Sequence, residues 1–181
     1  VMAGTAMVTA GIAFKLSLVP FHMWTPDVYQ GAPTPVTGFL ATVSKGAVFV
    51  ALARIYMDAE LHQYESLILA LSVLAAFSML IGNLLALLQE DIKRLLAYSS
   101  IAHFGYLLIV LIALTGSEMA SEAVTFYLAA YILTTLGAFT VIARVSREDQ
   151  QKSQISEFEG LFWRNKIQAT ALTIAMLSFA G

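Results

Sequence analysis

Two lysines lie deep inside apolar stretches of this 181-residue chain, and they are the side chains best placed to do chemistry. Lys15 lies in the apolar run that opens the sequence, and Lys45 lies near the middle of the next apolar stretch. An ammonium group is costly in hydrocarbon, so ionisable residues at such depth usually mark functional sites. Burial disfavours the charged form and a nearby carboxylate favours it, so such a lysine can take up and release protons. We therefore expect a proton relay; static pairing that fixes helix packing is the alternative.

Pro20 interrupts the first apolar stretch shortly after Lys15. Proline removes a backbone donor and clashes with the preceding turn of a helix. The polar backbone groups freed by a break are tolerated at membrane depth only beside protein or water, and transporters use such breaks to place polar groups at the midplane. The sequence therefore predicts a helix broken at Pro20, beside Lys15. A simple proline kink is the alternative.

Two histidines extend the candidate relay. His22 follows the break and could pass protons between Lys15 and cytoplasmic water, because imidazole titrates near neutrality. His103 lies inside a later apolar stretch, where a hydrogen-bonded core histidine is as good an interpretation as a relay role. The candidate proton relay thus consists of Lys15, Lys45, His22 and His103.

The composition indicates the environment in which these residues act. The chain is 59% hydrophobic and 12% charged, with a mean hydropathy of +0.76, whereas soluble domains carry roughly 25% charged residues. We therefore expect an integral membrane protein, and, because both ends lie inside apolar runs, the middle of a longer polytopic one. The net charge of −2 argues against a nucleic-acid partner, and the absence of cysteine excludes disulfides and thiolate metal sites.

Hydropathy predicts an all-α fold, a polytopic transmembrane helix bundle that forms a single domain. The expected elements are a broken helix over 1–30, spans over about 34–54, 66–88, 95–114 and 123–143, an amphipathic connector over 144–166, and the start of a last span over 167–181. The turn between the broken helix and the next span is punctuated by Gly31, Pro33 and Pro35.

The loop charges predict the orientation. The loops over 56–65 and 115–122 carry acids and no Lys or Arg. The basic residues gather at the other ends of the spans: Lys93, Arg94, Arg144, Arg147, Lys152, Arg164 and Lys166. The positive-inside rule places that basic side in the cytoplasm.

The chain lacks the common cofactor signatures. It contains no Gly-rich nucleotide loop, no His/Glu metal spacing and no nucleophile elbow. We therefore expect no flavin, iron–sulfur or nicotinamide site in this chain. If the protein takes part in redox chemistry, other subunits carry the electrons.

Three motifs carry a specific resemblance. They are KLSLVPFHMWTPDVYQGAPTPV from Lys15 to Val36, the Ser44-Lys45 pair, and DIKRLLAYSSIAH from Asp91 to His103. The chain resembles, over essentially its whole length, the antiporter-like, proton-translocating membrane subunits of NADH–quinone oxidoreductase (respiratory complex I). The Trp-Thr-Pro-Asp turn is most similar to the subunit N branch of that family.

The resemblance implies a larger fold of about fourteen helices, built from two inverted five-helix repeats that each contain one broken helix. It implies that Lys15 and Lys45 belong to a central polar axis, and it assigns His22 and His103 less firmly. The family's glutamate partner and its exit-side lysine would lie outside this chain. It also implies a multi-pass protein of the bacterial inner membrane whose partners are other complex I subunits, especially neighbouring antiporter-like ones, with flavin and iron–sulfur clusters elsewhere in the complex.

On this basis the expected function is a non-redox, proton-translocating subunit of a NADH:quinone oxidoreductase. A membrane subunit of a multisubunit sodium/proton antiporter is an alternative, because that type shares the fold and the lysines. A structural spacer in the membrane arm is a third possibility, and it would leave pumping intact when Lys15 or Lys45 is replaced.

Overall fold

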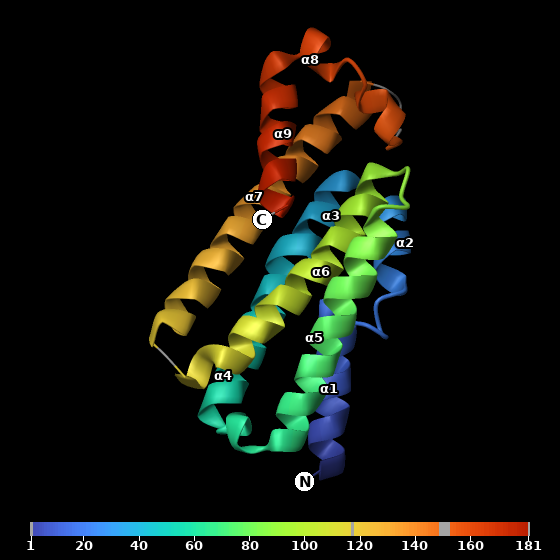
Figure 1. Cartoon of the computed structure of the whole chain (residues 1–181). Coiled ribbons are helices and arrows are strands. Elements are labelled where there is room, and N and C mark those ends of the chain that lie inside the picture. The colour runs from blue at the N-terminus through green and yellow to red at the C-terminus, as the bar shows by residue number, and fades with distance from the viewer. Residues whose placement is uncertain (1, 117, 149–152, 181) are drawn as a thin grey trace.

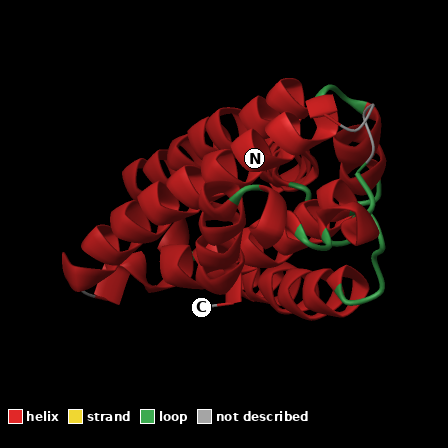
Figure 2. Ribbon diagram, turned by 90° about the horizontal axis from the view of Figure 1, so that it is seen from above, coloured by secondary structure: helices red, strands yellow, loops and turns green. Residues whose placement is uncertain are grey.

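The computed structural model is a bundle of helices and describes residues 2–116, 118–148 and 153–180 (Figure 1). Within these ranges every regular element is helical, apart from one isolated bridge between Asp91 and Gln154. Seen from above, the helices lie side by side and are joined by short loops (Figure 2). The prediction of an all-α bundle is confirmed.

Four segments among the described residues are long and apolar enough to cross a membrane. The first, Thr34–Asp58, comprises α3 (Thr34–Phe39), a π-helical turn (Leu40–Ser44) and α4 (Lys45–Asp58). The others lie in α5 (Glu65–Ala86), α6 (Ile92–Ile112) and α7 (Glu118–Glu148). Helices α1 (Met2–Leu16) and α9 (Lys166–Ala180) are apolar but shorter. The transmembrane character expected from hydropathy is thus present in the helices.

The first helix ends earlier than expected, at Leu16 and not at Pro20. Ser17 takes a left-handed conformation (φ 63°), its N–H donates to the Phe14 carbonyl at 3.0 Å, and the Leu18 N–H donates to the Ala13 carbonyl at 2.8 Å. This pair of bonds is a Schellman cap, which ends a helix and satisfies its last carbonyls. The chain re-enters helix at α2 (Trp24–Gly31), so the break covers residues 17–23 and contains both Pro20 and His22.

Two later boundaries also differ from the expected ones. Helix α6 begins at Ile92 because the Asp91 side chain caps it, accepting from the N–H groups of Lys93 and Arg94 at 2.9 and 3.1 Å. Helix α7 is longer than the expected span 123–143 at both ends, so the first residues of the expected connector continue the helix.

Short helical pieces form the turns. They are Leu61–Gln63 before α5, Ala113–Gly116 after α6, and, before α9, Ile155–Phe158 and α8 (Leu161–Arg164). Val1, Lys152 and Gly181, which the sequence analysis used as chain ends or orienting charges, lie outside the described residues.

The basic end of the bundle is tied together by side chains of α2 and α6. The Arg94 guanidinium donates to Asp27 Oδ1 at 2.6 Å and to Gln30 Oε1 at 3.1 Å. Lys93 Nζ donates to the Ala32 carbonyl at 3.1 Å. These contacts fix the re-entrant helix α2 against the start of α6, so the charges at this end anchor the short helix.

Helices α5 and α6 approach each other closely because glycine lies at two contact points. A Cβ on Gly82 would lie 2.8 Å from the Ala102 backbone nitrogen, and one on Gly105 would lie 2.8 Å from Met79 Cγ. Small residues let helix backbones approach in membranes, where van der Waals packing drives helix association.

We predict that Gly82→Ala destabilises the subunit by about 1–3 kcal/mol, because the new methyl group would push against the α6 backbone. The measurement is the melting temperature of the subunit within the detergent-solubilised complex. Gly137→Ala is the matched control, since a Cβ there meets nothing within 4 Å among the described residues. Equal melting temperatures for both variants would contradict the proposed close packing.

Candidate functional site

Lys45 is buried at the centre of the bundle, with 1% of its surface exposed. It is the first residue of α4, directly after the π-helical turn Leu40–Ser44. Its ammonium donates to Ser100 Oγ of α6 at 3.0 Å. It also lies 5.4 Å from the ring centroids of both Tyr29 and Phe104. A buried cation needs such compensation, and here one hydroxyl and two aromatic faces provide it.

A tyrosine from α7 completes the surroundings of Lys45. The Tyr131 hydroxyl lies 2.8 Å from Ser100 Oγ and 3.2 Å from the Ala41 carbonyl oxygen, and its side chain is buried. Ala41 belongs to the π-helical turn that precedes Lys45. Side chains from α2 and α6 therefore contact the ammonium group, and a side chain from α7 contacts the Ser100 hydroxyl beside it.

His103 lies one turn beyond Ser100 on α6, and its side chain is buried. Its Nδ1 lies 2.6 Å from the Tyr127 hydroxyl, and its ring centroid lies 5.5 Å from that of Tyr131. Hydrogen bonds therefore link Lys45 to Tyr131 through Ser100, and His103 contacts Tyr131 through its ring. The structure brings these two candidate residues together, as the relay hypothesis requires, while their roles stay a prediction.

A hollow of about 700 Å³ opens beside His103, between residues of α5, α6, α7 and α9. Polar groups line it among the aromatic rings: Asn83, Tyr106, Tyr127, Thr134 and Ser178. Asn83 Nδ2 donates to the Tyr106 hydroxyl at 2.9 Å, and the hydroxyls of Thr134 and Ser178 lie 3.2 Å apart. Most of its lining is apolar, and these polar groups are the ones that could hold water in it.

Lys15 and His22 lie outside this network. Lys15 is exposed on the surface formed by the described residues, one residue before α1 ends. His22 is buried in the break, where neither ring nitrogen makes a hydrogen bond among the described residues. The described residues thus bring together Lys45 and His103 but leave His22 apart from them.

Hydroxyl groups satisfy some of the polar groups at the break. The Val19 N–H donates to Ser78 Oγ at 3.0 Å, and Thr25 Oγ1 donates to Ser17 Oγ at 2.5 Å. These bonds meet the requirement that irregular backbone inside a membrane protein be covered by protein.

Sequence reasoning missed Tyr131 and Tyr29 as neighbours of Lys45. The sequence pattern that could have indicated these neighbours is the helical spacing of the polar residues. Ser100 and His103 share a face of α6, and Tyr127 and Tyr131 share a face of α7.

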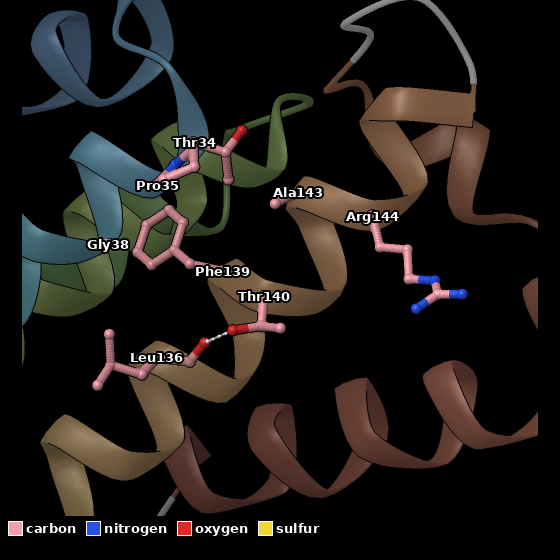
Figure 3. Close-up of a pocket in the computed structure, with 8 residues that line it drawn as sticks. All are labelled: Thr34, Pro35, Gly38, Leu136, Phe139, Thr140, Ala143 and Arg144. Atoms are coloured by element: carbon pink, nitrogen blue, oxygen red, sulfur yellow. Dashed lines mark hydrogen bonds between the residues drawn. The ribbon is translucent and has the colours of Figure 1, made fainter.

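A second hollow, of about 630 Å³, lies between α3 and α7 (Figure 3). Most of its lining is apolar, and its polar groups are Thr34, Thr140 and Arg144; the Thr140 hydroxyl bonds to the Leu136 carbonyl at 2.7 Å. None of the four relay candidates lines it. The Lys45 network is therefore the better candidate for chemistry.

Comparison with known proteins agrees with this arrangement. The family model described as NADH:quinone oxidoreductase/Mrp antiporter, TM matches residues 1–181. A subunit N of NADH-quinone oxidoreductase from Methylococcus capsulatus is 53% identical over 182 residues, which cover 99% of this chain and 37% of that protein.

Solved structures give the same result. Respiratory complex I from Thermus thermophilus matches with a TM-score of 0.76 and 43% identity, over 93% of this chain and 36% of the matched one. An archaeal membrane-bound sulfane sulfur reductase matches with a TM-score of 0.77 and 30% identity, over 91% and 34%. The Mrp complex from Dietzia shares the fold with a TM-score of 0.87 at 24% identity, over 100% and 33%.

This chain spans about a third of the length of these relatives. The match to the family model nevertheless covers the whole chain, and the motifs around Lys15, Lys45 and His103 had indicated the same family. The chain belongs to the NADH:quinone oxidoreductase/Mrp antiporter transmembrane family.

Proposed function

We propose that this chain is part of a proton-translocating membrane-arm subunit of a NADH:quinone oxidoreductase, and that Lys45 takes up and releases the proton. One observation carries the proposal: the buried Lys45 ammonium is held by the Ser100 hydroxyl. A hydroxyl can accept from an ammonium and can donate to a neutral amine. The contact therefore suits both protonation states of Lys45, as a relay requires.

Lys15 supplies the coupling in this proposal. Like charges disfavour one another, so a proton on Lys15 would disfavour a proton on Lys45. A change in the charge of Lys15, caused by an event elsewhere in the complex, would thus make Lys45 gain or lose a proton. His103, whose ring contacts that of Tyr131, is the next proposed station, and His22 in the break is a proposed path toward cytoplasmic water.

The chemistry of electron transfer is assigned to other subunits. The proposed role of this chain is non-redox, with flavin and iron–sulfur clusters elsewhere in the complex and quinone reduced outside this chain. Its partners would be the other complex I subunits, above all neighbouring antiporter-like ones, and lipid. The 53% identity to a subunit N supports this assignment and an inner-membrane location.

A sodium/proton antiporter subunit is the second candidate. It is favoured by the family model, whose description includes the Mrp antiporter, and by the fold shared with the Mrp complex from Dietzia. If growth of a strain that lacks the full-length gene changes with the sodium concentration of the medium, that result would favour this function. Growth unaffected by sodium would favour the redox-driven pump.

We predict that Lys15→Ala in the full-length subunit lowers both NADH–quinone turnover and proton uptake at least about tenfold in membrane vesicles, because a group that moves protons is lost. Assembly of the complex is confirmed first on native gels. Normal rates of both processes in an assembled complex would favour the spacer interpretation.

Lys45→Met tests the buried lysine directly. Methionine keeps most of the apolar volume and removes the ammonium, so we expect an assembled complex whose coupled turnover falls at least about tenfold. Lys166→Met is the matched control, because Lys166 is exposed at the start of α9 and outside the Lys45 network. Equal activities of the two variants would contradict the role of Lys45.

A further inference from the structure

The Tyr131 hydroxyl, on α7, contacts two groups close to Lys45. Its hydroxyl lies 2.8 Å from Ser100 Oγ, which accepts from the Lys45 ammonium, and 3.2 Å from the Ala41 carbonyl oxygen in the π-helical turn before Lys45. A phenol has one proton to donate. Tyr131 therefore has two alternative acceptors, and both belong to the immediate surroundings of the lysine.

The ring of Tyr131 is fixed independently of its hydroxyl. Its centroid lies 5.4 Å from that of Phe104 and 5.5 Å from that of His103, and the side chain is 4% exposed. Packing of this kind holds an aromatic ring in place. Removal of the hydroxyl alone should therefore leave the ring where it is and change only the hydrogen bonds.

The hydrogen-bond capacity of Ser100 explains why a second donor matters. A serine hydroxyl offers two lone pairs and one proton. When Lys45 is charged, its ammonium occupies one lone pair of Ser100 and Tyr131 occupies the other. When Lys45 is neutral, the Ser100 proton must turn toward the amine, while Tyr131 still donates to the oxygen. Tyr131 thus holds the Ser100 oxygen in the same place in both states.

We infer that Tyr131 is a positioning residue for Lys45, which it serves by fixing the Ser100 hydroxyl from α7. The inference rests on the proposed function, since it assigns Tyr131 a part in the protonation cycle of Lys45. Tyr131 itself neither gains nor loses a proton overall.

The test compares Tyr131→Phe with Tyr56→Phe in the full-length subunit, within assembled complexes in membrane vesicles. Tyr56 is fully buried on α4, and its hydroxyl has no hydrogen-bond partner among the described residues, so it is a matched control. We expect Tyr131→Phe to lower proton-coupled turnover about fivefold and Tyr56→Phe to leave it unchanged. Equal turnover in the two variants would overturn the inference.

A double variant shows whether Tyr131 acts through Ser100. If it does, Ser100→Ala combined with Tyr131→Phe loses no more turnover than Ser100→Ala alone, and the pH profile of turnover shifts by the same amount in both. A purely structural role of Tyr131 would instead multiply the two single losses and leave the pH profile of Tyr131→Phe unmoved. That result would also overturn the inference.

Ser100→Thr and Ser100→Ala keep the inference testable if Tyr131→Phe fails to assemble. The threonine keeps the hydroxyl and should retain coupled turnover, whereas the alanine should lose it; normal turnover in Ser100→Ala would overturn the inference. Lys45→Met separates this test from the proposed function. Loss of coupling in Lys45→Met with normal coupling in Tyr131→Phe refutes the positioning role alone, whereas normal coupling in Lys45→Met refutes the proposed function.

Discussion

The arrangement of the bundle depends on the burial of one ammonium group. Lys45 lies with 1% of its surface exposed among apolar helices, where an unpaired cation is very costly. Its compensation comes from separate elements: the Ser100 hydroxyl on α6 and the aromatic faces of Tyr29 on α2 and Phe104 on α6. Each of these helices must therefore approach α4 at a defined depth and rotation.

Two features of the fold make that approach possible. The Schellman cap at Ser17 ends α1, and the chain resumes helix at α2, which places the Tyr29 ring 5.4 Å from the Lys45 ammonium. The bond from Arg94 to Asp27 then fixes α2 against the start of α6, the helix that carries Ser100. The charges at the basic end and the buried lysine are thus linked through one short re-entrant helix.

Residue type and depth alone pointed to Lys15, Lys45, Pro20 and the membrane setting, because charges and breaks stand out in an apolar sequence. The end of α1 could not be found this way, since it depends on a left-handed serine where glycine would have been the usual signal. Tyr131 escaped notice for another reason: an aromatic residue in an apolar helix is common. Only the packing of α7 against α6 shows that its hydroxyl faces Ser100.

The choice of a hydroxyl as the partner of Lys45 has an energetic consequence. A carboxylate in contact would favour the charged lysine so strongly in this low-dielectric setting that distant charges could hardly change its state. A neutral serine satisfies the hydrogen bond without that bias, so the protonation of Lys45 stays sensitive to charges farther away. Two unit charges about 10 Å apart interact by about 1.7 kcal/mol at an effective dielectric constant near 20, which is more than tenfold in an equilibrium. In the proposed relay, a change of charge at that distance from Lys45 would be enough to alter whether the lysine holds its proton, without movement of the helices.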